Sequence, residues 1–259
     1  MAGFRTTAKF FFYGSTLYRP ARRAFLSVFD RRKLRALDKA IGLYGRFIGK
    51  GDLVFDIGAN VGDYTDIFLG LGSRVIAVEP NPDCADRIRK MESTSCVSVE
   101  NVAIGDCEGS AQLSICHEDS ISTLSEDWKQ RFGGWRWERK VSVPVTTLDA
   151  LAKRHGLPRF VKIDTEGYDE KVLRGMSFRP PILSFEFIPD LPNLALNCLS
   201  ITGDEYVYNY IAGQTFELGS PCWLTLKQMQ EKVYNISCAD GFGDIVAKQP
   251  NSESHILPA

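Results

Sequence analysis

Three charged side chains in the segment VKIDTEG, residues 161–167, have the clearest chemical potential in this chain. Lys162, Asp164 and Glu166 are spaced two apart, and side chains at that spacing along a strand share one face. Charges at the end of a buried strand are costly unless they are paired or used. Asp164 or Glu166 could take the proton of a hydroxyl group, and Lys162 could stabilise negative charge that develops on oxygen. The segment therefore predicts either a catalytic centre or an ion pair of Lys162 with Asp164 or Glu186.

An acidic rim is the second feature of this region, because Glu186 ends another apolar run and should lie at the same sheet edge. Oxygen ligands of this kind suit a divalent metal. Acidic rims also bind sugar hydroxyl groups directly, and we therefore predict no metal. The chain has three histidines and seven cysteines without a C-x-x-C pair, which is not the spacing of a zinc site. Such cysteines are typical of reduced thiols in a cytoplasmic protein.

A glycine-containing turn lies upstream, where the apolar run of VFDIGANVGDYT, residues 54–65, breaks. Gly58 and Gly62 allow the backbone to turn tightly or to approach a ligand closely. The helical stretch that follows would add free N–H donors at its start. Because ligands of open α/β sheets bind at the carboxyl ends of the strands, this turn predicts a nucleotide-type cofactor site.

The choice of cofactor depends on the residues around these glycines. Glu79 follows the next apolar run, 21 residues after Gly58, which is about the spacing of an acid that binds ribose hydroxyls. A turn capped before Pro80 would also explain it. Asn60 breaks the G-x-G-x-x-G pattern of a dinucleotide site. S-adenosylmethionine lacks a pyrophosphate and carries a sulfonium and an amino group, whose charge Asp56 would balance, so we predict this cofactor.

The elements that must position these residues follow from the alternation of short apolar runs with amphipathic stretches, which is typical of βαβ units and a mostly parallel sheet. Strands are predicted over residues 53–57, 75–78, 97–102, 160–163, 182–187, 207–210 and 244–247. Helices are predicted over residues 64–71, 82–91, 147–155, 169–174 and 225–233. The candidate residues end or follow the strands, which would bring them to one edge of the sheet.

Between residues 111 and 145 the alternation lapses, which indicates an insertion with an extra strand pair that covers the site. His117 lies in this segment and would suit a general base, although an exposed loop histidine is the commoner outcome. Trp135 and Trp137 could present an aromatic platform to a sugar, and we favour their burial beneath a flap. These three residues and Glu186 are our candidates for substrate contact.

Together these stretches resemble the FkbM-type S-adenosylmethionine-dependent methyltransferases. The matching stretches, in chain order, are FDIGANVGDYT, VIAVEPNP, NVAIGD, VPVTTLDAL, VKIDTEGYDEKVLRG, LSFEF and GDIVA. Each motif alone is weak, whereas their order and spacing from Gly42 to Ala247 are fairly specific.

The resemblance implies a class I methyltransferase fold. This fold is α/β and Rossmann-like, with a mostly parallel seven-stranded sheet, helices on both faces and an antiparallel last strand. The methionine half of the cofactor is expected to bind Asp56, Gly58, Asn60 and Gly62. The ribose is expected at Glu79, and the adenine beside Ala103, Ile104 or Asp106, of which Asp106 could equally cap a turn. The family most often methylates hydroxyl groups of sugars, polyketides or related small molecules.

The charge of the chain is unevenly distributed. Nine Lys and Arg residues and one acid precede Asp38, so a net charge of −1 hides +8 in front and −9 behind. We predict that residues 1–41 form a basic leader or helical cap, which could also touch anionic lipid, a nucleotide-sugar phosphate or nucleic acid. The apolar cluster at residues 10–13 is too short for a signal sequence or a membrane span. Residues 42–248 should form the methyltransferase domain and residues 249–259 a flexible tail.

These observations predict an enzyme that methylates a hydroxyl of a carbohydrate or glycosylated small molecule, with S-adenosylmethionine as the donor. The alternatives are an NAD(P)-dependent oxidoreductase and a cofactor-binding scaffold without turnover. We expect no nucleic-acid partner, because the body of the domain is acidic. Peripheral contact of the basic leader with an anionic membrane stays open. The sequence does not identify the acceptor, the methylated position or the oligomeric state.

Overall fold

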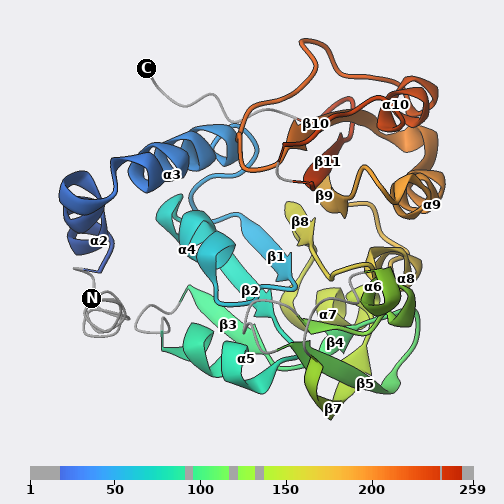
Figure 1. Ribbon diagram of the computed structural model, residues 1–259, viewed down its shortest axis with the longest axis horizontal. Coiled ribbons are helices and arrows are strands. Elements are labelled where there is room, and N and C mark those ends of the chain that lie inside the picture. Colours follow the sequence, from blue (N-terminus) through green and yellow to red (C-terminus); the bar gives the residue numbers. More distant parts are fainter. Residues whose placement is uncertain (1–17, 91–95, 117–121, 132–136, 240, 253–259) are drawn as a thin grey trace.

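A seven-stranded sheet with helices on both faces forms the centre of the protein (Figure 1). The computed structural model describes residues 18–90, 96–116, 122–131, 137–239 and 241–252. In spatial order the strands are β10 (Val207–Ala212), β11 (Gly243–Lys248), β9 (Ile182–Phe187), β8 (Phe160–Ile163), β1 (Leu53–Ile57), β2 (Arg74–Val78) and β3 (Val97–Glu100). All pairs are parallel except those of β11, which runs antiparallel to both neighbours. The predicted class I fold with an antiparallel last strand is confirmed.

The central strands are apolar because both of their faces are covered. One face packs against α7 (Leu148–His155), α8 (Asp169–Arg174), α9 (Pro192–Thr202) and α10 (Leu226–Val233). The other face packs against α3 (Arg31–Tyr44), α4 (Asp63–Gly70) and α5 (Pro82–Arg89). A short 3₁₀ helix, η1 (Gly203–Glu205), follows α9. Both layers hold the carboxyl ends of β1, β2 and β8 at one edge, where a cofactor is expected.

A second, four-stranded sheet covers the lower part of the molecule in Figure 1. Its order is β4 (Ala103–Ile104), β7 (Trp137–Thr146), β5 (Gly109–Cys116) and β6 (Ser122–Thr123), and α6 (Glu126–Arg131) follows β6. Strands β5 and β7 form a long antiparallel pair, the arrangement expected for the segment 111–145. This sheet has a small core of its own around Leu113 and Val143.

In the part of the chain that the structure describes, α2 (Tyr18–Phe29) and α3 precede the sheet. Asp30 begins α3 by accepting a hydrogen bond from the Lys33 amide. The last turn of α3 buries Leu43 and Tyr44 in the core. Helix α3 therefore packs against the sheet. None of the helices in the described ranges combines the length and apolar character needed to cross a membrane.

Most predicted elements coincide with observed ones to within about two residues. The predicted strand 97–102 was too long, because β3 ends at Glu100 and β4 belongs to the second sheet. Helices α6 and α9 were not predicted. Helix α9 begins with Pro192, and its exposed side carries only the short polar residues Asn193, Asn197 and Ser200, which contrast weakly with the apolar side. At the C-terminal end, the Gln249 amide donates to the Pro181 carbonyl, and residues 253–259 lie outside the described residues.

Candidate active site

A cleft of about 210 Å³ lies at the carboxyl ends of β1, β2 and β8. Its walls include the loop after β1, the end of β2 and the loop after β8. Leu113, Ser122 and Leu124 reach the cleft from the second sheet. The covering segment therefore contributes to the wall of the cleft, as expected for an insertion near a site.

The loop after β1 brings backbone very close to the loop after β8. Gly58 has φ +80° and its N–H donates to the Val78 carbonyl. A Cβ at this position would lie 1.8 Å from the backbone oxygen of Asp164, so only glycine fits. Asn60, with φ 51°, also adopts the left-handed conformation, and Gly62 begins α4. The loop is thus a tight backbone cradle whose shape depends on these residues.

Glu79 is a buried carboxylate on the cleft wall. One of its oxygens accepts from the Asn60 amide and the other from the Asn81 amide, both at 2.7 Å. Burial raises the pKa of Glu79 to about 7, against the opposing effect of these hydrogen bonds. Each oxygen keeps a lone pair that could accept from a ligand hydroxyl.

Asp56 lies beneath the loop, buried at 2% exposure. Its Oδ2 accepts a hydrogen bond from the Thr65 hydroxyl at 2.6 Å. Burial raises the pKa of Asp56 to about 6, while the Thr65 hydrogen bond opposes that shift. This hydrogen bond links β1 to α4, and Asp56 is not among the residues that line the cleft.

The remaining cofactor candidates divide between the cleft and the surface. Ala103 and Ile104 line the cleft beside Val102, and together they offer an apolar wall. Asp106 is instead ion-paired with Lys171 at 2.9 Å, and this hydrogen bond lowers the pKa of Asp106. The structure therefore gives Asp106 a partner other than a cofactor.

Lys162 is almost completely buried, with 1% of its surface exposed. Its Nζ lies 2.8 Å from Asp164 Oδ2, 3.8 Å from Asp244 Oδ1 and 4.2 Å from the centre of the Tyr64 ring. Burial lowers the pKa of Lys162, but the two carboxylates outweigh it and hold the pKa well above its usual value. The predicted pair with Asp164 is present, whereas Glu186 is not the second partner. Asp244 takes that place, because β11 returns antiparallel beside β9 and brings its first residues to this edge.

Glu166 follows Asp164 on the same wall, in the left-handed conformation with φ 54°. A non-glycine residue in this conformation is strained, and such strain is concentrated at functional sites. The Thr123 hydroxyl donates to the Glu166 carbonyl, so β6 helps to hold the loop. Burial and the charges of Asp164 and Asp169 raise the pKa of Glu166 to about 8. Glu166 is therefore a carboxyl group that can carry or release a proton near neutral pH.

Glu186 lies beside this wall in a smaller adjoining hollow that it shares with Asp169 and Glu170. Its backbone N–H donates to Asp169 Oδ2, and Asp169 Oδ1 accepts from the Thr165 amide. Burial, followed by the nearby carboxylates, raises the pKa of Glu186 well above its usual value. The expected acidic rim thus exists and includes two further acids, Asp169 and Asp244, that were not predicted.

The other substrate candidates lie in the second sheet or outside the described residues. Trp137 is half-buried and packs edge-on against Trp128, with ring centres 6.3 Å apart. His117 and Trp135 are among the residues that the structure does not describe. Within the described residues, no group of three or more His, Cys, Asp or Glu side chains is arranged to hold a metal ion.

Comparison with known proteins gives one family match and one curated relative. The sequence profile of the Methyltransferase FkbM domain matches residues 56–210. The hexuronic acid methyltransferase AglP of Haloferax volcanii is 27% identical over 148 residues, which are 56% of this chain. The aligned region spans 59% of the length of that relative.

Solved methyltransferase structures also align with this chain. The precorrin-6Y C5,15-methyltransferase of Geobacter metallireducens aligns with 82% of this chain and 88% of its own, at a TM-score of 0.44 and 14% identity. A TehB-like methyltransferase of Corynebacterium glutamicum aligns with 89% of this chain and 99% of its own, at 0.42 and 11%. At such low scores these likenesses say nothing about the chemistry of this chain.

Proposed function

The chain belongs to the FkbM family of methyltransferases, and we propose that it methylates a hydroxyl group of a carbohydrate or glycosylated small molecule. S-adenosylmethionine is the methyl donor of this family. The proposal depends on one observation above all, which concerns both the donor and the acceptor. A carboxylate suited to bind ribose and two carboxyl groups suited to proton transfer face the same cleft.

The cleft fits S-adenosylmethionine in the character of its walls. Gly58 and Asn60 line the cleft with backbone in the left-handed conformation, and Gly58 lets the loops after β1 and β8 approach each other closely. Glu79 would accept the ribose hydroxyls, and its two backbone hydrogen bonds fix its orientation. Val102, Ala103 and Ile104 would contact the adenine. Asp56 would stabilise the loop from below.

The residues of the β8 wall would prepare the acceptor. When bound, S-adenosylmethionine supplies an electrophilic methyl group on a sulfonium. A hydroxyl is a weak nucleophile, so a nearby carboxylate that takes its proton accelerates transfer. Asp164 is held by Lys162 on its Oδ2 and faces the cleft, which suits it to orient the hydroxyl and accept its proton. Glu166, with its raised pKa, is the second candidate for this role.

Lys162 would serve mainly as a positioning residue. Its burial keeps the ammonium group away from solvent, and its pairing with Asp164 and Asp244 fixes the carboxylate next to the cleft. Removing the charge would take from Asp164 the ammonium group that holds its Oδ2.

A sugar acceptor is supported by two observations. Acidic groups around the β8 wall offer acceptors for several hydroxyl groups, including Asp164, Glu166 and Glu186. The relative from Haloferax volcanii is named for activity on a hexuronic acid, which is a sugar derivative. Substrate contacts by His117, Trp135 and Trp137 stay predictions. All seven cysteines are free, which supports the predicted cytoplasmic location.

The test is incubation of the purified protein with methyl-labelled S-adenosylmethionine and a panel of sugars, nucleotide sugars and glycosides. We expect label in a methyl ether that resists mild alkali, since an ester would be hydrolysed. Label in an alkali-labile ester would contradict the O-methylation of a hydroxyl but leave the methyltransferase assignment intact. Calorimetry that shows NAD binding and no S-adenosylmethionine binding would contradict the whole proposal.

A further inference from the structure

Helix α2 presents an apolar face that the rest of the described protein does not cover. Phe25, Val28 and Phe29 are 39%, 70% and 64% exposed. Their spacing places them on one side of the helix. The rings of Phe25 and Phe29 lie against each other, with centres 4.8 Å apart. Exposed apolar side chains that gather in this way mark an interaction surface.

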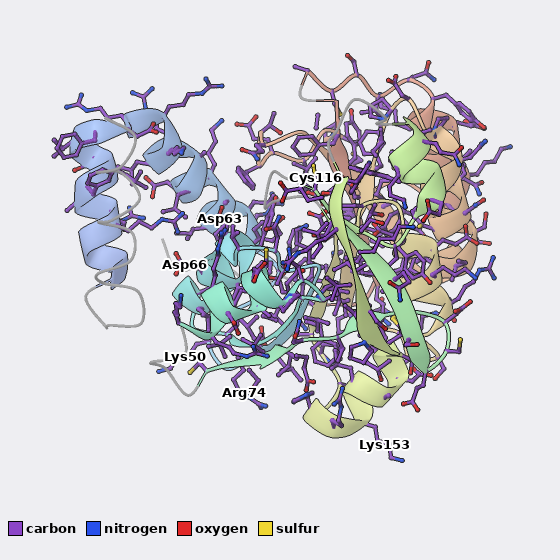
Figure 2. All side chains as sticks on the ribbon, turned by 60° about the horizontal axis from the view of Figure 1, so that its bottom comes forward. Lys50, Asp63, Asp66, Arg74, Cys116 and Lys153 are labelled. Atoms are coloured by element: carbon purple, nitrogen blue, oxygen red, sulfur yellow. The ribbon has the colours of Figure 1, made fainter. Side chains whose placement is uncertain are left out.

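The side of α2 next to this apolar face is attached to the domain. Leu26 is buried, and Arg22 forms ion pairs with Asp63 and Asp66 of α4. Figure 2 shows both acids on the side of α4 toward the N-terminal helices. In Figure 1, α2 lies at the left edge of the molecule and is joined to the sheet through α3. The apolar face therefore lies beside the attached side and is left exposed.

Basic residues follow this face directly. Helix α3 begins with Arg31, Arg32 and Lys33, and Arg35 lies one turn further. The first turn of a helix disfavours positive charge, and α3 has no acidic residue there. None of these four side chains has an acidic partner in the described part of the chain. Their presence is thus unfavourable for the helix itself, which points to a partner with negative charge.

We propose that α2 and the start of α3 bind the anionic surface of a lipid bilayer. Phe25, Val28 and Phe29 would enter the interface, and the basic residues would contact the headgroups. A phosphate backbone would match the cations but would leave the three apolar side chains in water, so a nucleic acid fits less well. This inference does not depend on the acceptor proposed above.

The contact would also bring the cleft close to the membrane. Asp63, which pairs with Arg22 of α2, lines the cleft. An acceptor held at the surface of the bilayer would then reach the site without leaving the membrane.

Co-sedimentation with vesicles tests the apolar contribution. The full chain is mixed with phosphatidylcholine vesicles that contain about 30% phosphatidylglycerol, at about 0.1 M salt. We expect Phe25→Gln/Val28→Gln/Phe29→Gln to reduce the partition coefficient roughly tenfold or more. The matched control is Leu157→Gln/Tyr234→Gln, because these side chains are 70% and 65% exposed elsewhere on the surface. The control should bind like the unmodified protein.

A second pair of variants tests the contribution of charge. Arg31→Gln/Arg32→Gln/Arg35→Gln should also lower the partition coefficient roughly tenfold, and about 0.5 M salt should have a similar effect on the unmodified protein. The control changes three exposed basic residues that Figure 2 shows away from α2: Lys50→Gln, Arg74→Gln and Lys153→Gln. Unfolding is not expected, since the test variant removes positive charge from a helix N-terminus.

Hydroxyl-radical footprinting identifies what covers the face. Protection of Phe25 and Phe29 that requires anionic vesicles supports the proposal. Equal binding by the test and control variants would overturn it, as would no binding of the unmodified protein. Protection without vesicles would show that the chain or a second copy covers the face, and a dimer lost in the triple variant would identify the copy. Retention on nucleic acid with no retention on vesicles would assign the cations to that partner. S-adenosylmethionine binding is measured in parallel, so failure here leaves the proposed function untouched.

Discussion

On the β1–β2 side of the cleft, both carboxylate oxygens of Glu79 accept hydrogen bonds from backbone N–H groups. On the β8 side, by contrast, Asp164 pairs with Lys162, and Glu166 lies near the carboxylates of Asp164 and Asp169. Burial raises the pKa of Glu79 and of Glu166. The next-largest influence on the pKa acts in opposite directions in the two residues. Backbone donors favour the ionised form of Glu79 and lower its pKa, whereas neighbouring carboxylates disfavour the ionised form of Glu166 and raise its pKa.

This difference separates binding from chemistry. A carboxylate fixed by backbone donors keeps one orientation and suits the recognition of a ligand. Glu166, whose ionised form is disfavoured by burial and by neighbouring carboxylates, suits proton transfer near neutral pH. Substitutions on the two walls should therefore separate affinity for the donor from the rate of turnover.

The largest effect is expected on the β8 wall. Asp164→Asn should lower kcat by roughly 10²- to 10⁴-fold, because the amide cannot accept the proton of the hydroxyl. The affinity for S-adenosylmethionine should stay within a few-fold. Single-turnover kinetics and calorimetry measure the two quantities. Near-normal turnover would show that Asp164 is not the base.

The control for Asp164→Asn is Glu217→Gln. It breaks an ion pair of similar length, 2.7 Å to Lys39, on an exposed surface. Thermal melting of both variants detects misfolding, because Lys162 is left with Asp244 as its main partner in the first variant. Equal loss of activity in both variants would point to a general effect on stability.

A smaller effect, on binding, is expected on the other wall. Glu79→Gln places an amide NH₂ against a backbone donor and removes the charge, so the affinity for S-adenosylmethionine should fall roughly 10- to 100-fold. Titration calorimetry measures this change. Glu100→Gln is the matched control, because Glu100 ends the neighbouring strand β3 and is paired with His155 outside the cleft. If both variants bind alike, Glu79 does not contact the donor.

The smallest effect concerns pH. Burial and Asp164 raise the pKa of Glu166 to about 8, so the folded state holds a proton that the unfolded state releases near pH 4.5. This contribution to the free energy of unfolding is present below about pH 4.5 and is lost as the pH rises through about 8.

Glu166→Gln should therefore be more stable than the unmodified protein at pH 8, and this difference should shrink as the pH falls to 5. Urea unfolding at the two pH values measures the difference. The variant should also have a flatter dependence of kcat/KM on pH between 6 and 9 if Glu166 takes part in proton transfer. If the variant and the unmodified protein differ in free energy of unfolding by the same amount at both pH values, the pKa of Glu166 is not raised.

Much of the fold could be predicted because its strands are short apolar runs with clear ends. Strands β1, β8 and β9 and helix α8 coincide with their predicted bounds. Helix α9 was missed, since its exposed side has only short, uncharged polar residues and the contrast with its apolar side is weak. The start of α3 carries three consecutive basic residues in place of the acidic residues that usually indicate the first turn of a helix.

The candidate site could be predicted only in part. Glycines and acids at strand ends indicate a cofactor cleft, because open sheets bind ligands there. The role of Asp244 could not be predicted, since it lies 82 residues after Lys162 and reaches it only when β11 joins the sheet beside β9. Asp169 accepts a hydrogen bond from the Glu186 amide of the next strand, and this contact likewise depends on the tertiary structure.

The sequence by itself determined the family, the order of the strands along the chain and the residues available for chemistry, because these depend on local pattern and spacing. Only the tertiary structure decided which charges meet. It placed Lys162 between Asp164 and Asp244, gave Asp106 to Lys171 and left the apolar face of α2 exposed. Pairing and burial depend on contacts between distant segments, and these contacts set the cost of each charge.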